Sequence, residues 1–284
     1  MKNVIKTYLL IGALSALLLM IGGAIGGQNG VIIALVFSLI FNIGAFWFSD
    51  KIVLKMYKAV PVDRAHQSGL YEMVERLARK AGVPMPKVYI IKNPSPNAFA
   101  TGRNYKNAAV AATTGLLSAL SLDEVEAVMA HEMTHVKNRD TLVSTMAAVI
   151  ASAIMHLTFL ARFAMIFGGG RSGGGSNNNN AGGLLNMILL IVLAPIAAVL
   201  IQSAISRSRE YMADKGSKEL IGTGTPLANA LRKIDNAVQR GHGIQASPET
   251  AHMFIMNPIS GKSLLSLFST HPTTEDRIQK LMYE

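Results

Sequence analysis

The sequence predicts a mainly α-helical integral membrane protein with a small β-sheet, four transmembrane helices and a soluble domain split between two stretches of chain. Half of the 284 residues are hydrophobic and only 15% are charged, whereas about a quarter are charged in an ordinary soluble domain. No charged residue occurs from Thr7 to Ser49, and a second stretch poor in charge runs from Thr141 to Ser206. This segregation is typical of a protein that crosses a lipid bilayer.

The first apolar stretch predicts a transmembrane hairpin over residues 1–48, with spans at residues 5–25 and 31–48. A spanning helix needs about 20 mainly apolar residues, and the turn-forming sequence GGQNG lies between the two spans. A cleaved signal peptide is the alternative for the first span, because two lysines lie near its start. The apolar core of a signal peptide is only about 7–15 residues long, so we expect two helices instead.

The second apolar stretch, residues 141–205, predicts another hairpin with spans at residues 141–167 and 184–205. The tract between them, residues 168–183, reads GGGRSGGGSNNNNAGG. Such a tract cannot bury a core and is expected to be flexible. Two ionisable residues interrupt the first of these spans, and such groups are costly in lipid. A helical hairpin buried in a soluble core is therefore the alternative.

The basic residues predict the orientation of the spans. Lys2 precedes the first span, Lys51 and Lys55 follow the second, and the turn between the spans carries no charge. Lysine and arginine favour the cytoplasmic side of a membrane. Both ends of each hairpin are then cytoplasmic, so residues 49–140 and 206–284 can meet there as one soluble domain.

The first soluble segment predicts a helix, short strands and a second helix. Residues 64–81 have helical apolar spacing and end before Gly82. The sequences KVYIIK, residues 87–92, and NAFATG, residues 97–102, are typical of strands, and we expect a sheet of two to four strands. Ser121 then begins an S-x-x-E capping box, which predicts a helix through the sequence HEMTH.

Composition limits the partners and the metal ligands. The net charge of +10 could suggest nucleic acid, but the basic residues cluster beside the apolar segments, and no motif for binding DNA or RNA occurs. We expect no nucleic-acid partner. Cysteine is absent, so disulfides and thiolate metal sites are excluded, and any metal site must use histidine and carboxylate.

The sequence HEMTH, residues 131–135, predicts a metal site. On a helix, His131 and His135 project from one face about 6 Å apart along the axis, so both imidazoles can bind one ion. Glu132 points elsewhere on the helix and can accept a proton from a water that the ion activates. This is the arrangement of a zinc peptidase. Two surface histidines that happen to be four residues apart are the alternative.

A catalytic zinc site needs a third protein ligand, and RSREYMAD, residues 207–214, supplies the candidates. Glu210 and Asp214 share one helix face, so Glu210 can bind the metal while Asp214 accepts the free ring N–H of a ligand histidine. An exposed acidic pair that forms ion pairs with nearby basic residues is the alternative.

These motifs together resemble the HtpX family of bacterial membrane zinc metalloproteases, which is related to the gluzincins Ste24 and BepA. The resemblance rests on HEMTH, on SRSREYMAD downstream, on NAFATG before the metal helix, on THP near the end and on the placement of the spans. It implies a gluzincin-type catalytic domain that is split by the second hairpin.

The resemblance also implies roles and a setting. It implies one Zn²⁺ per chain on His131, His135 and Glu210, catalysis by Glu132 and a supporting role for Asp214. It implies cleavage of misfolded or damaged membrane proteins at the bacterial inner membrane, without a nucleotide. The polypeptide substrates and the lipid bilayer are thus the expected partners, and the sequence leaves the oligomeric state open.

Two further groups are candidates for holding substrate. The backbone of Asn97, Ala98, Phe99 and Ala100 could pair with an extended peptide by strand addition, although an internal strand with Phe99 in the core is an alternative. In Ste24-like enzymes a histidine and an arginine face the bound peptide. The resemblance therefore implies His271 and Arg277 as residues that bind substrate or the oxyanion, with a solvated loop histidine as the alternative.

Two other functions compete with this interpretation. A prenyl-protein protease of narrow specificity would use the same chemistry, but we expect such an enzyme to have more spans around a chamber. A membrane scaffold or transporter could bind metal without catalysis. Transporters place their polar groups at mid-membrane, whereas HEMTH and RSREYMAD flank the spans.

Overall fold

A computed structural model describes residues 2–65, 68–152, 207–242, 250, 253–255 and 272–283. Most of the second predicted hairpin, including its tract at residues 168–183, lies outside these residues. His271 also lies outside them.

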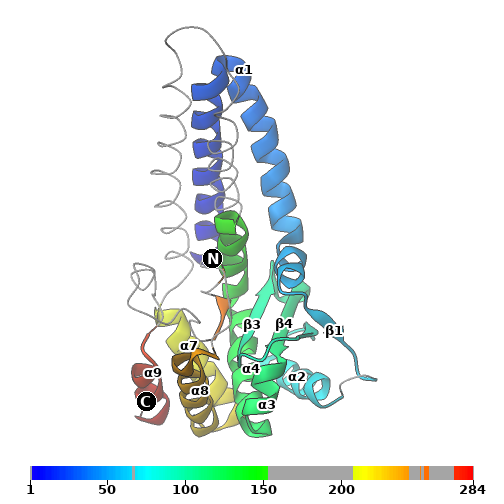
Figure 1. Ribbon diagram of the computed structural model, residues 1–284, viewed down its shortest axis with the longest axis vertical. Helices are drawn as coiled ribbons and strands as arrows, with labels where there is room; N and C mark the ends of the chain where they lie inside the picture. The colour runs from blue at the N-terminus through cyan, green and yellow to red at the C-terminus, as the bar shows by residue number, and fades with distance from the viewer. Residues whose placement is uncertain are drawn as a thin grey trace.

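Helix α1, Lys2–Met56, forms an antiparallel helical hairpin that reverses near Gly27 (Figure 1). Gly27 has a φ of 57°, a left-handed conformation that glycine adopts without steric cost. The Asn42 side chain donates to Ser15 Oγ at 2.8 Å, although these residues would lie about 40 Å apart in a straight helix. Among the described residues, one helix of sufficient length and hydropathy to cross a membrane is found, Gly27–Met56. The other three spans stay predictions.

A four-stranded mixed sheet lies beneath the hairpin (Figure 1). Its order is β1-β2-β4-β3; β2 and β4 are parallel, and the other pairs are antiparallel. The strands expected in KVYIIK and NAFATG are confirmed. Strand β3 lies at an edge of the sheet, although all its residues are buried. The strands are β1 Val60–Val62, β2 Lys87–Ile91, β3 Ala98–Gly102 and β4 Ala108–Thr113.

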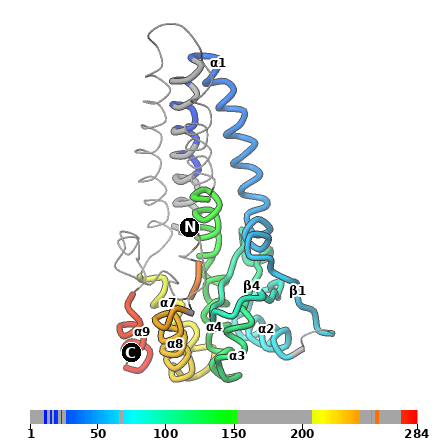
Figure 2. Tube along the Cα trace, viewed as in Figure 1, coloured from blue at the N-terminus to red at the C-terminus, as the bar shows by residue number. Residues whose placement is uncertain are grey.

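Helices pack around the sheet and form the main core with it (Figure 2). The first of them starts later than predicted, because Ala65 N–H binds Asp63 Oδ1 in a turn before it. The apolar side chains of Leu77, Val110 and Met133 are fully buried in this core. The soluble helices are α2 Ser68–Ala81, α3 Thr114–Ala119, α4 Leu122–Asn138, α7 Arg207–Ile221, α8 Thr225–Ala237 and α9 Thr274–Tyr283, with short helical turns at Tyr105–Asn107 (η1) and Val238–His242 (η2).

Helix α4 begins and ends at defined caps. The predicted capping box is confirmed, because Ser121 Oγ accepts from Glu124 N–H while the Glu124 carboxylate accepts from Ser121 N–H. The helix does not continue unbroken into the apolar stretch that follows it. Arg139 is left-handed, with a φ of 60°, and a separate apolar helix, residues 140–152, follows it.

Helix α7 lies directly against α4 because the contact is made by small residues. A Cβ atom on Gly216 would lie 2.4 Å from Thr134 Cγ2, which only glycine avoids. Ser217 Oγ donates to Ala127 O at 2.7 Å. This close approach brings the N-terminal turn of α7, which carries Glu210, to the HEMTH face of α4.

Candidate active site

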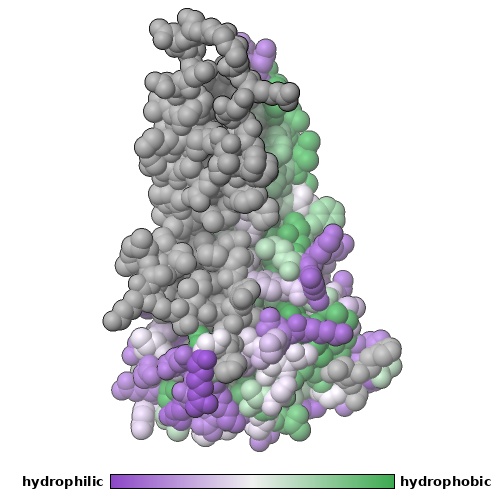
Figure 3. Space-filling model, in the orientation of Figure 1, coloured by the Kyte–Doolittle hydropathy of each residue, from purple (hydrophilic) through white to green (hydrophobic). Residues whose placement is uncertain are grey.

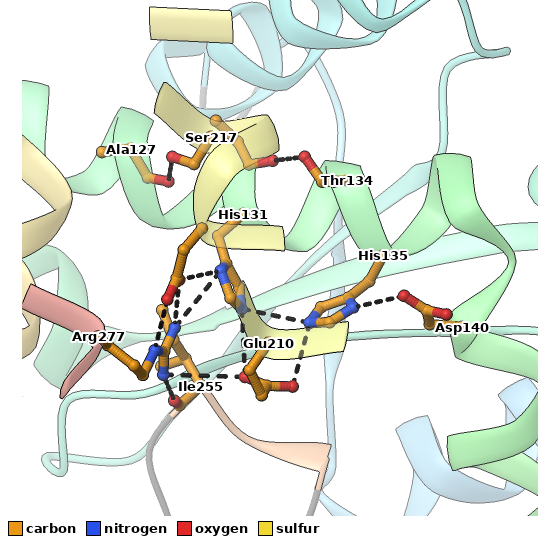
Figure 4. A network of polar contacts seen from close by, with 11 residues as sticks. Ala127, His131, Thr134, His135, Asp140, Glu210, Ser217, Ile255 and Arg277 are labelled. Carbon is orange, nitrogen blue, oxygen red and sulfur yellow. Dashed lines mark hydrogen bonds and ion pairs between the residues drawn. The ribbon is translucent and has the colours of Figure 1, made fainter. Parts of the chain in front are cut away.

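Three side chains from α4 and α7 converge on one point (Figure 4). The Nε2 atoms of His131 and His135 are 3.2 Å apart. Glu210 Oε2 lies 3.7 Å from His131 Nε2, and Glu210 Oε1 lies 3.6 Å from His135 Nε2. The structure thus brings together the two predicted histidines and the carboxylate that lies 75 residues beyond the second of them.

These distances fit a tetrahedral ion. Zinc bonds to nitrogen and oxygen ligands are about 2.0–2.2 Å long, so two ligand atoms of one tetrahedral ion lie about 3.3–3.6 Å apart. The separation of the two Nε2 atoms is close to this range, and so is the distance from each Nε2 atom to one Glu210 oxygen, with a different oxygen facing each histidine. A set of two imidazoles and one carboxylate is also typical of a catalytic zinc site that keeps one position open.

A carboxylate orients each histidine from behind. His131 Nδ1 lies 2.9 Å from Asp214 Oδ1, and His135 Nδ1 lies 3.1 Å from Asp140 Oδ2. Both carboxylates are almost fully buried. A proton on each Nδ1 leaves each Nε2 free to bind a metal.

Sequence reasoning predicted a supporting position for Asp214 but missed Asp140. In an unbroken helix, a residue five positions after His135 would lie about 140° away around the axis. The left-handed Arg139 bends the chain and brings Asp140 back toward the imidazole. Arginine gives no sequence signal for this conformation, so the sequence offered only an acidic residue shortly after the motif.

Burial and neighbouring charges shift the pKa values of both histidines. Burial lowers the pKa of His131, and the adjacent Asp214 carboxylate opposes this only in part. Burial also acts to lower the pKa of His135, but the hydrogen bond to Asp140 and the negative charge of Glu210 outweigh it and raise that pKa to about 9. Protons and a metal ion therefore compete for His135.

Glu132 lies on the wall of a small cavity next to the three ligand candidates. The cavity has a volume of about 30 Å³ and is also lined by Ala100, Met253 and Phe254, which is room for one or two water molecules. Burial raises the pKa of Glu132 to about 7, and the backbone N–H of Ala100 hydrogen-bonds the carboxylate. A carboxylate with a pKa near neutral can both accept and donate a proton.

The predicted substrate strand runs past this cavity. Ala98, Phe99 and Ala100 are buried in β3, and Asn97 is buried just before it. The backbone N–H of Ile255 donates to Ala98 O at 3.2 Å, so the chain itself occupies part of this edge. The role of Asn97, Ala98, Phe99 and Ala100 in binding substrate stays a prediction.

Arg277 is fully buried in α9 beside the two metal-binding helices. Its guanidinium forms a two-point ion pair with Asp214, with N–O distances of 2.6 and 2.9 Å, and donates to Ile255 O at 2.8 Å. Arg277 Nη1 is 3.8 Å from Glu210 Oε2. Arg277 therefore holds the carboxylate that orients His131. Its predicted contact with substrate stays a prediction.

Known proteins are similar to this chain in sequence and in fold. The sequence model of peptidase family M48 matches residues 64–284. The protease HtpX homologue of Methylibium petroleiphilum is 54% identical over 285 residues, which cover 99% of this chain and 98% of that protein. The protease HtpX homologue of Syntrophobacter fumaroxidans is 50% identical over 276 residues, 97% of each chain.

A solved structure supports the fold alone. The crystal structure of S. mikatae Ste24p matches with a TM-score of 0.54 at 23% identity, over 99% of this chain and 66% of that one. The sequence matches extend through both α4 and α7, which carry the candidate metal ligands. The chain belongs to peptidase family M48 and is a metalloprotease.

Proposed function

We propose that this metalloprotease is a zinc-dependent endopeptidase of the bacterial inner membrane, with its catalytic domain on the cytoplasmic side. We propose misfolded or damaged membrane proteins as its substrates. The observation that carries the chemistry is the convergence of His131, His135 and Glu210 within 4.8 Å of one another, next to the buried carboxylate of Glu132. The apolar helix Gly27–Met56 and the lysines at its C-terminal end, Lys51 and Lys55, support the membrane setting.

Each residue of the site has one task in this proposal. His131, His135 and Glu210 would hold the zinc, and Asp214 and Asp140 keep the two imidazoles oriented. When bound, zinc would supply Lewis-acid activation of a water and of the scissile carbonyl. Glu132 accepts the proton of the attacking water and then donates it to the leaving amine. The N–H of Ala100 holds the Glu132 carboxylate during both transfers.

Replacement of Glu132 tests this assignment. The purified full chain should contain one zinc ion and should cleave casein in a way that a chelator abolishes. Glu132→Gln should keep the zinc and lose cleavage, whereas His131→Ala should lose both. A Glu132→Gln protein that still cuts an unfolded membrane protein would refute the assignment.

Proteomics tests the substrate class. Substrates should accumulate in cells that carry the Glu132→Gln variant. The proteins that are more abundant in these cells than in cells with the active enzyme should be enriched in membrane proteins. Accumulation of soluble proteins alone would refute the proposed substrate class but not the chemistry.

A further inference from the structure

Two cation–aromatic pairs lie together toward the lower end of α1. The guanidinium of Arg103, in the turn after β3, lies 4.4 Å from the ring centre of Trp47. Arg103 also donates to Trp47 O at 2.9 Å, so the turn is fixed to the helix. Lys51 Nζ lies 5.4 Å from the ring centre of Phe48. Both rings are about half exposed, at 52% and 53%.

The position of Trp47 along the helix matches a membrane surface. Trp47 comes 20 residues after the turn at Gly27, which is about 30 Å at the rise of an α-helix, and the hydrocarbon core of a bilayer is about 30 Å thick. Large exposed apolar side chains occupy this interval, and Lys51 and Lys55 come after it. Figure 3 shows the hydrophobic surface of α1 with hydrophilic residues at its lower end.

The charges of this patch favour an anion. Among the described residues, no ion pair engages Arg103 or Lys51. The carboxylate of Asp50, next to Lys51 in the sequence, lies close enough to Tyr89 to affect it. Burial raises the pKa of Tyr89, and the negative charge of Asp50 raises it further. A guanidinium that uses one N–H group on Trp47 O keeps others for a phosphate, and its planar fork suits that group.

We propose that Trp47, Lys51 and Arg103 form a binding site for the headgroup of an anionic phospholipid in the bilayer around α1. Trp47 places its ring at the level of the headgroups, as tryptophan does at membrane surfaces. Arg103 and Lys51 bind the lipid phosphate. The inference rests on the membrane setting of the proposed function but not on its chemistry.

This site fixes the height of the catalytic cavity above the membrane. Strand β3 leads from Ala100, which hydrogen-bonds Glu132, to Arg103 three residues later, a distance of about 10 Å along an extended chain. Thr101 Oγ1 also lies 2.9 Å from Thr145 Oγ1 in the apolar helix after α4. Strand β3 thus connects the catalytic carboxylate directly to the proposed headgroup site, so the enzyme reaches segments of membrane proteins that emerge from the bilayer.

Trp47 is the only tryptophan of the chain, so its fluorescence reports on this site alone. The full chain with Glu132→Gln, in which proteolysis plays no part, is reconstituted in vesicles of phosphatidylcholine and phosphatidylglycerol. In paired samples either the zwitterionic or the anionic lipid is brominated at the same mole fraction. Quenching of Trp47 by the brominated anionic lipid should be severalfold stronger, because each cation enriches anionic lipid about fivefold nearby.

Substitutions of the two cations give the decisive comparison. K51Q with R103Q should make the two brominated lipids equally effective, whereas R232Q, which removes an exposed cation on α8, should leave the preference intact. Circular dichroism with the helix content and melting temperature of the parent chain shows that each variant is folded. Equal quenching in the parent chain, or a preference that survives K51Q with R103Q, would overturn the proposal. Stronger quenching by bromine near the chain ends than by bromine near the headgroup would also overturn it.

Discussion

His135 Nδ1 lies 3.1 Å from Asp140 Oδ2, across the break that Arg139 makes after helix α4. A helix that continued through this position would leave the imidazole without its carboxylate. The break therefore has a chemical result, because it fixes the ring so that Nε2 points at His131 and Glu210. We expect the orientation of His135 to depend on a residue outside the motif.

Asp140→Ala should weaken metal binding about 10–100-fold, which is the usual cost of losing a carboxylate behind a ligand histidine. Asp140→Asn should have a smaller effect, because an amide oxygen can still accept the Nδ1 proton. Competition with a chelator of known affinity measures the change. Asp123→Ala is the matched control, since this carboxylate is exposed in the first turn of the same helix. Equal affinities for Asp140→Ala and Asp123→Ala would show that Asp140 does not position the ring.

The affinity for zinc should rise with pH. The pKa of His135 is raised to about 9, so the protein's own groups favour protonated His135 below this pH. Zinc must then displace a proton, and its affinity should fall about tenfold for each pH unit between 9 and 7. Titration calorimetry in buffers of different ionisation enthalpy measures the released proton. In Asp140→Ala the pKa falls, so the same decline should begin at a lower pH. A pH-independent affinity in the parent chain would contradict the prediction.

The stability of the metal-free chain should fall as the pH rises, whereas its affinity for zinc should rise. A pKa raised above its ordinary value of about 6.5 means that protonated His135 stabilises the fold. This contribution is complete below about pH 6.5 and is lost as the pH rises through 9. Denaturant unfolding of the chelated protein at several pH values checks the sign, with His135→Gln as the control that should lose this dependence.

Gly216→Ala should destabilise the contact between α4 and α7. The added methyl group would lie 2.4 Å from Thr134 Cγ2 and 2.5 Å from Thr134 Oγ1, and overpacking of this kind costs about 1–3 kcal/mol. Because α7 carries Glu210, the affinity for zinc should fall together with the melting temperature. Gly69→Ala is the control, since nothing lies within 4 Å of the added atom.

A second substitution separates packing from other causes. Thr134→Ala removes the two closest atoms, Cγ2 and Oγ1, and leaves only Cβ, at 3.0 Å, so Gly216→Ala with Thr134→Ala should be more stable than Gly216→Ala alone. A double-mutant cycle of thermal unfolding measures this coupling. Additive losses would show that the two residues do not meet.

Arg277→Met should destabilise the protein by about 3–5 kcal/mol, because it leaves the Asp214 carboxylate buried without its partner. Burial acts to raise the pKa of Asp214, and the Arg277 guanidinium keeps that pKa below its ordinary value. Adding Asp214→Asn should recover part of the stability, since no unpaired charge remains. The affinity for zinc should not recover. Chemical denaturation and metal competition distinguish these effects, and an unchanged stability of Arg277→Met would contradict the structure.

The sequence predicted the parts of the site that local patterns encode. The capping box of Ser121 and Glu124 defines the start of α4, and helical spacing then places His131 and His135 on one face. Glu210 was one candidate for the third ligand, because a zinc site without cysteine needs a further histidine or carboxylate, and the family resemblance implied it as the ligand. The two histidines follow from the periodicity of a helix and the preferences of a metal, whereas the choice of Glu210 also used the resemblance.

The remainder depends on tertiary packing. The break at Arg139 is set by a backbone conformation that arginine seldom adopts, so Asp140 could not be predicted to lie beside His135. The parallel pairing of β2 with β4 and the burial of Arg277 against Asp214 likewise join segments that are distant in sequence. The contact of Gly216 with Thr134 explains why the helices meet, but only after their packing is known.

Anomalous X-ray diffraction at the zinc absorption edge, measured on crystals of the full chain, tests the central claim most directly. We predict one peak per chain, about 2.0–2.2 Å from Nε2 of His131, Nε2 of His135 and a carboxylate oxygen of Glu210. A peak at other residues, or a Glu210 carboxylate turned away from the ion, would contradict the proposed catalytic site.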